Sequence, residues 1–155
     1  MAASDATTGQ AIHGRYSTGL HNVGSYQASG WPFITGSLME DGVEHKISFP
    51  MVAKSVTVIV SGSIASDASL RVHFQSSGSD DGTNGVAAGH HYIMLSADKD
   101  SMTFDVKCKE IYVSSAGSVT GYEIFAEMTN IPTDRMYTLT GSGVTSAGTD
   151  PRADR

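Results

Sequence analysis

Histidine is the first residue type in this sequence that could do chemistry, because six copies occur and imidazole both binds metal ions and transfers protons. His90 and His91 are adjacent, so on a strand they would point to opposite faces and could not bind one ion together. No His-x-His or His-x-x-x-His spacing occurs. His45 and His73 fall on strand positions that we expect to face outward. The histidines therefore predict surface or hydrogen-bonding roles and no metal site.

Serine and carboxylate residues are plentiful, but their spacing matches no catalytic motif. No Gly-x-Ser-x-Gly nucleophile elbow occurs, and Gly141-Ser142-Gly143 lacks the lysine of a phosphate-binding loop. The loop 77–85 carries Asp80, Asp81 and Asn84, which supply too few ligands for the roughly six to eight oxygens that calcium takes. We therefore expect no enzyme, no catalytic residues, no cofactor and no bound metal.

Composition limits the possible partners. The formal net charge is −6 and no basic cluster occurs, which disfavours nucleic-acid binding. A single cysteine, Cys108, excludes an intrachain disulfide, and we expect it to be a small buried residue. Residues 1–6 do not look like a secretory signal, and no apolar run approaches the ~20 residues of a membrane-spanning helix. No membrane association is expected.

Apolar residues alternate with period two through the centre of the sequence, which is typical of strands with one buried face. The clearest strands are expected around residues 47–49, 56–60, 70–74 and 102–108, with a bulge or turn near 109–110. Further strands are expected at 22–27, 32–38, 92–96, 110–114 and 119–129. The last could also be a short helix, but alternation and β-branched residues favour a strand.

Many short strands separated by turn signals predict an all-β fold, and specifically an antiparallel two-sheet sandwich of jelly-roll type. We expect the sandwich at residues 21–130, flanked by an extended N-terminal arm (1–20) and a C-terminal arm (131–155). These weakly apolar ends are either disordered tails or arms that become ordered on a neighbouring subunit, and the second is preferred.

The contact residues expected from this interpretation are apolar and aromatic. Trp31, the only tryptophan, has three readings: a core residue, a protein-contact residue or a platform for a sugar ring. The predicted interface set is Tyr16, Leu20, Trp31, Ile131, Met136, Tyr137 and Leu139.

Three stretches resemble small virion structural proteins of tailed phages from marine cyanobacteria and related bacteria. They are residues 21–37 (HNVGSYQASGWPFITGS), then 45–50 followed by a strand like 56–60, and residues 136–145. The resemblance implies a particle component with no catalytic residues, located in the virion after assembly in the bacterial cytoplasm. A capsid decoration or cement protein is favoured. It would form a homo-oligomer, for example a trimer, and bind the major capsid protein or other virion proteins.

Two alternatives stay open at this point. One is a neck, tail or fibre-base component of the same kind of particle. The other is a lectin-like, carbohydrate-binding protein for host attachment, which would use Trp31 to stack on a sugar.

Overall fold

The computed structural model describes residues 19–79, 90–119, 121–141 and 143, and within them the chain is mostly antiparallel β-sheet. The elements in chain order are α1 (Gly24–Gln27), β1 (Trp31–Leu38), β2 (Glu44–Val60), β3 (Ser69–His73), η1 (Ser77–Ser79), β4 (Ile93–Leu95), β5 (Ser101–Phe104), β6 (Cys108–Ala116), β7 (Gly121–Pro132) and η2 (Thr133–Arg135). The expected all-β, antiparallel class is therefore confirmed for the described residues.

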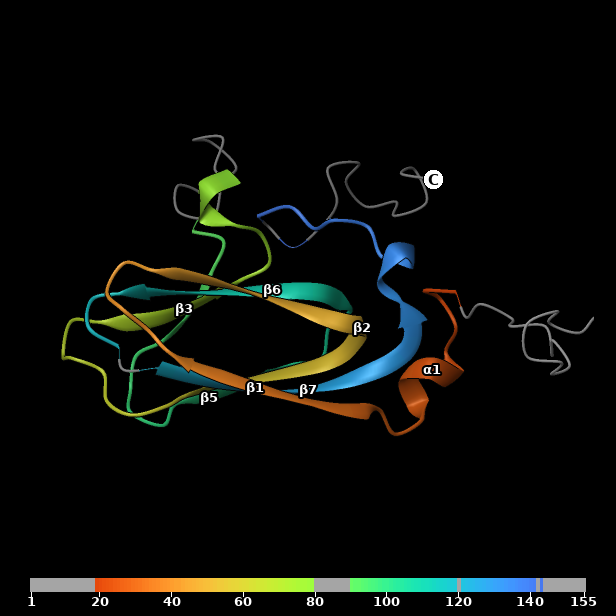
Figure 1. Cartoon of the computed structure of the whole chain (residues 1–155), viewed down its shortest axis with the longest axis horizontal. Coiled ribbons are helices and arrows are strands. Elements are labelled where there is room, and N and C mark those ends of the chain that lie inside the picture. Colours follow the sequence, from red (N-terminus) through yellow and green to blue (C-terminus); the bar gives the residue numbers. More distant parts are fainter. Residues whose placement is uncertain (1–18, 80–89, 120, 142, 144–155) are drawn as a thin grey trace, which may run out of the picture.

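One seven-stranded sheet contains all of these strands, in the order β1-β7-β2-β6-β3-β4, with β5 also paired to β2. The long strand β2 organises it. Its first part, Glu44 to Ser48, pairs with β6, whereas Ser55 to Val60 pairs with β7 and Val56 to Ile59 with β5. In Figure 1, β3 and β6 lie across from β1, β5 and β7, and β2 curves from one group to the other.

The bend in β2 has a local cause. The register of both ladders shifts between Ser48 and Ser55, and Pro50 lies inside this interval. Proline has no N–H to donate to a ladder, and a bulge bends a strand, so both features fit a change of direction here. Because β2 belongs to both halves, all the strands form one hydrogen-bonded sheet. The expected two separate sheets and the jelly-roll connections are therefore not confirmed.

Most expected strands are present, with two differences. Residues 22–27 form a helical turn instead of a strand: Gln27 N–H donates to the Val23 carbonyl, and the Asn22 side chain accepts from Ser25 N–H at 3.2 Å. Such short-range polar bonds compete with strand formation. Residues 102–108 do not form one strand, because β5 ends at Phe104 and β6 begins at Cys108.

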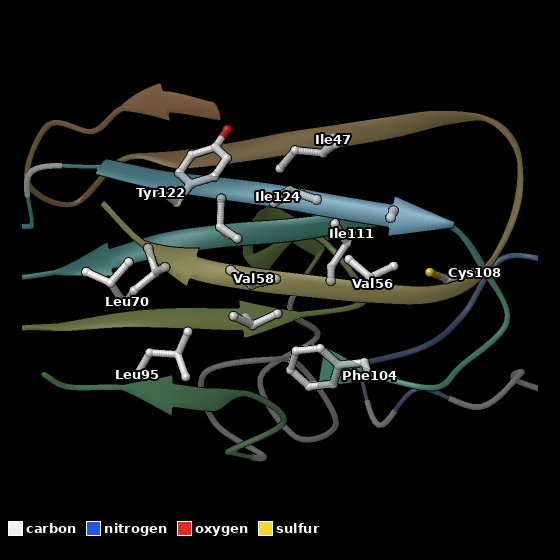
Figure 2. Close-up of a cluster of buried hydrophobic side chains, with 14 of the residues drawn as sticks. Ile47, Val56, Val58, Leu70, Leu95, Phe104, Cys108, Ile111, Tyr122 and Ile124 are labelled. Carbon is white, nitrogen blue, oxygen red and sulfur yellow. The ribbon is translucent and has the colours of Figure 1, made fainter. Parts of the chain in front are cut away.

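The main hydrophobic core lies between the two halves of the sheet. Figure 2 shows side chains from β2, β6 and β7 meeting there, among them Val56, Ile111 and Ile124. Val56, Val58 and Val60 are all buried, as the alternation predicts. Cys108 is also buried in this cluster, which confirms its expected packing role.

A second, smaller cluster covers the outside of the β2 bend. It consists of Leu20, Val52, Ile131 and Met136, with Tyr26, Tyr137 and Leu139 packed against it. Hydrogen bonds hold the segments together: the Thr129 hydroxyl donates to the Val52 carbonyl at 2.7 Å, and the Tyr26 hydroxyl donates to the Leu20 carbonyl at 2.8 Å. Residues on both sides of the expected 21–130 domain thus pack on the chain's own sheet.

Candidate functional site

The most exposed apolar side chains of the described residues gather on and beside β1. Its alternate residues face opposite ways: Phe33 turns inward and packs edge-on against Phe49, with ring centroids 5.3 Å apart. On the outer face, Ile34 is 76% exposed and Leu38 is 81% exposed. Ile34 lies opposite Phe125 of β7, which is also exposed. We call Ile34, Leu38 and Phe125 the β1 apolar surface.

The free edge of β1 adjoins this surface. β1 is at one end of the strand order and pairs only with β7 among the described strands. An edge strand leaves backbone N–H and C=O groups available to another chain. Charged residues usually protect such edges, yet Trp31–Leu38 contains none. This arrangement is chemically suited to protein contact.

Trp31 stands at the end of β1 and is 68% exposed. A groove of about 310 Å³ runs beside it, bordered by Pro32, Met51 and Asn130 among others. The core reading of Trp31 is therefore wrong, because most of this residue is exposed at the first pair of the β1–β7 ladder, opposite Met128. A contact role and a sugar-stacking role both agree with its exposure.

The other predicted contact residues lie elsewhere. Leu20, Ile131 and Met136 are buried in the second cluster, and Tyr137 and Leu139 are half-buried against it. Their apolar neighbours come from the same chain, so the burial that was expected on a neighbouring subunit is largely supplied within the domain. Tyr16 lies outside the described residues. Sequence reasoning missed Ile34, Leu38 and Phe125, because the sequence does not show that β1 is an edge strand or which of its faces points outward.

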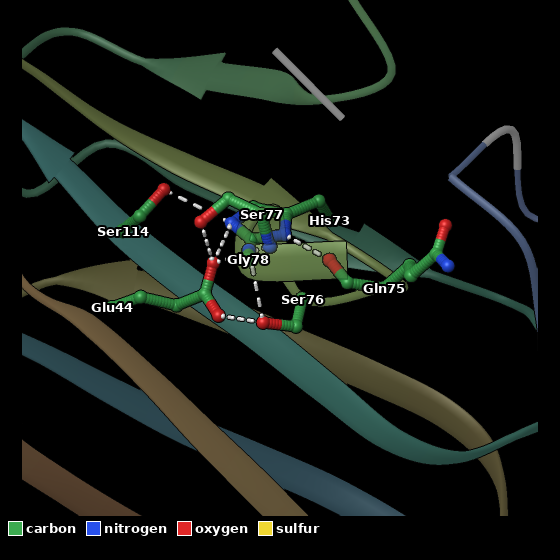
Figure 3. Close-up of polar contacts among 7 residues, drawn as sticks. All are labelled: Glu44, His73, Gln75, Ser76, Ser77, Gly78 and Ser114. Atoms are coloured by element: carbon green, nitrogen blue, oxygen red, sulfur yellow. Dashed lines mark hydrogen bonds and ion pairs between the residues drawn. The ribbon is translucent and has the colours of Figure 1, made fainter. Parts of the chain in front are cut away.

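A separate polar cluster surrounds His73, which is 1% exposed instead of facing outward as expected. Figure 3 shows its ring between the Gln75 carbonyl and the Ser114 hydroxyl, at 2.7 Å from Nδ1 and 2.9 Å from Nε2. A carbonyl only accepts, so Nδ1 carries the proton and Nε2 of the neutral ring accepts from Ser114. Burial is tolerated because both ring nitrogens have partners.

Glu44 forms hydrogen bonds with the segment that follows β3 and so connects it to this cluster. Its carboxylate accepts hydrogen bonds from the Ser76 hydroxyl at 2.7 Å and from the Ser77 backbone N–H at 2.8 Å, and it also contacts the Ser77 hydroxyl. Burial alone would raise the pKa of Glu44, but the hydrogen bonds from Ser77 and Ser76 outweigh it and lower the pKa below the usual value. Burial lowers the pKa of His73, so its neutral form is favoured.

This cluster contains a serine, a histidine and a glutamate, but they are not arranged as a nucleophilic triad. In a triad the carboxylate orients the histidine through Nδ1, whereas here Nδ1 donates to a backbone carbonyl. Glu44 lies on the side of Nε2 at 3.7 Å. The geometry supports a structural role in fixing residues 74–78 against β2 and β6.

Other candidate chemistry is limited in the described residues. No group of three or more His, Cys, Asp or Glu side chains there could hold a metal ion. Burial raises the pKa of the Cys108 thiol to about 12, which leaves it unreactive near neutral pH. The carboxylates of Asp80 and Asp81 and the amide of Asn84 fall outside the described residues.

No protein-family model, curated protein or solved structure matches this chain. Within the described ranges, no helix has the length and apolar character needed to cross a bilayer. The functional interpretation therefore depends on the β1 apolar surface, the Trp31 groove and the chain's own sequence pattern.

Proposed function

We propose that this chain is a non-enzymatic structural subunit of a bacteriophage particle, which associates with copies of itself and binds other virion proteins. The observation that carries the proposal is the β1 apolar surface, where Ile34 and Leu38 are more than three-quarters exposed at a strand edge that has no charged residue. Exposed apolar patches on soluble domains commonly mark interaction sites. Burying these side chains against a partner would remove apolar surface from water, and this would favour association.

The distribution of charge supports self-association. Two copies with a net charge of −6 repel each other, so they can approach best through uncharged surface. Residues 22–39 contain no Asp, Glu, Lys, Arg or His, and this is the longest such run in the sequence. The run includes all of β1.

The virion context is supported by the resemblance of residues 21–37, 45–50 and 136–145 to small structural proteins of marine phages. Decoration or cementing of the capsid is the preferred role, because an acidic β-rich domain suits the outer surface better than a DNA-facing position. A neck, tail or fibre-base position is the alternative within the same class.

Imaging of the native particle tests this proposal. We expect density for this chain at symmetric positions on the shell, on two-fold axes or on three-fold axes where pairs of copies meet. Five-, six- or twelve-fold placement along one axis would instead assign it to the neck or tail. Absence of the chain from purified particles would contradict the virion role.

The exposed Trp31 favours a second candidate, a lectin-like role in host attachment. An exposed aromatic ring beside a groove that a polar residue, Asn130, also lines is an arrangement suited to binding a sugar ring. A glycan array with wild type and Trp31→Ala tests it. Specific binding by the wild type that the variant loses would favour this candidate over decoration, whereas no binding by either would remove it.

We further propose that the sheet is a variant of the two-sheet sandwich in which β2 belongs to both sheets. The division of its ladder between β6 and β7 supports this description. The jelly-roll connection pattern stays a prediction.

A further inference from the structure

We propose that the free edge of β1 pairs antiparallel with the same edge of a second copy of this chain, across a two-fold axis near Gly36. The inference rests on the self-association proposed above and adds the surface, the partner and the register. The seven-stranded sheet of one copy would then continue directly into the sheet of the other.

Pro32 identifies which backbone groups point to the free edge. It lies opposite Glu127 of β7, and proline has no N–H to donate across that pair. Pro32 therefore occupies a non-hydrogen-bonded position of the β1–β7 ladder, where N–H and C=O face outward. Ile34, Gly36 and Leu38 have the same parity, so their N–H and C=O groups also face the free edge.

With a two-fold axis at Gly36, the outward N–H and C=O groups of one copy face the outward C=O and N–H groups of the other copy. Ile34 of one copy lies opposite Leu38 of the other, and Gly36 lies opposite Gly36. Three hydrogen-bonded pairs that exchange two bonds each give about six backbone hydrogen bonds. Pairing by this register also places the exposed Ile34 and Leu38 side chains next to each other on the outer face, where apolar cross-strand pairs are stabilising.

Electrostatics and strand length both favour a second copy at this edge. Residues 22–39 carry no ionisable side chain other than Tyr26, so a two-fold axis within β1 brings no like charges together there. The opposite end of the sheet is less suitable, because β4 has only three residues, Ile93–Leu95. The eight residues of β1 provide the longer ladder.

The register predicts a specific cross-link. With the axis at Gly36, Thr35 of one copy forms a non-hydrogen-bonded pair with Ser37 of the other, with Cα atoms about 4.5 Å apart, within the range that a disulfide spans. Two copies of Thr35 are diagonal neighbours at about 7–8 Å, which is too far. Cys108 is buried and does not compete for oxidation.

The experiment uses full-length Thr35→Cys and Ser37→Cys proteins, oxidised separately and as an equal mixture, with the wild type sedimented in parallel. We expect a cross-linked dimer in the mixture and little in either variant alone. A wild-type oligomer without this selective cross-link would overturn the β1 register but leave self-association intact. A wild type that is monomeric at every concentration would overturn both this inference and the self-association in the proposed function.

Discussion

His73 shows how a polar residue becomes part of a buried strand. The alternation around residues 70–74 correctly places a strand, but the sequence contains no sign that Gln75 and Ser114 satisfy both ring nitrogens. These partners come from the following turn and from β6, forty-one residues away in the case of Ser114. Period-two patterning treats histidine as polar and assigns it to the outer face. Contacts that depend on tertiary structure were not predictable from the pattern.

Burial of His73 makes folding stability depend on pH. Its folded-state pKa is lowered, so below the ordinary histidine value of about 6.5 the unfolded chain binds more protons than the folded one. Stability from this residue is therefore present above that pH and is lost as the pH falls below it. We expect the unfolding free energy to decrease between pH 7 and about 5 and the slope to flatten in His73→Gln.

Urea unfolding at a series of pH values measures this slope. His21→Gln is the matched control, since His21 is exposed. Equal slopes in the wild type and His73→Gln would show that His73 does not control the pH dependence. Glu44 also makes the fold less stable as the pH falls, but at lower pH than His73. Its pKa is lowered in the folded state, so its contribution is present above about pH 4.5 and is lost below it.

Among the elements, β2 and the segments beside its bend differ most from the expectation. The sequence predicts residues 47–49 and 56–60 as strands, and both are present, but as parts of one strand that serves both halves of the sheet. Strand patterning is local, whereas the choice between one bent strand and two separate ones depends on which strands flank it. The same limit explains residues 131–139: their apolar side chains have no regular period, and those of Ile131 and Met136 are buried against Val52 at the β2 bend.

Ile131 provides a test of this second cluster. It is fully buried, so Ile131→Ala should lower the unfolding free energy by about 2–5 kcal/mol through lost contacts and a cavity. Val23→Ala, at an exposed position, should change it by less than about 0.5 kcal/mol. Chemical denaturation of both variants measures the difference. If Ile131→Ala were as mild as the control, residues 131–155 would behave as a separate arm, as predicted from the sequence.

At the scale of the whole molecule, the acidic charge and the uncharged edge have opposite effects on association. Net charge keeps copies apart, and the β1 apolar surface offers one place where they can meet. The all-β class was predictable because alternation is a strong signal. Trp31 is exposed, which agrees with the contact role that stays a prediction. The β1 apolar surface was not predictable from the sequence. The outer face of a strand cannot be distinguished from its inner face until the neighbouring strands are known.

The most direct test of the central claim is sedimentation equilibrium of the full chain over a wide concentration range. We expect the wild type to form a dimer or a larger assembly built from it, and Ile34→Lys with Leu38→Lys to be monomeric because like charges meet across the axis. Ile34→Glu with Leu38→Lys should associate again, since the register then pairs opposite charges. Met94→Lys, an exposed change on β4, should behave as the wild type. Unchanged association of the Ile34→Lys, Leu38→Lys protein would contradict the account.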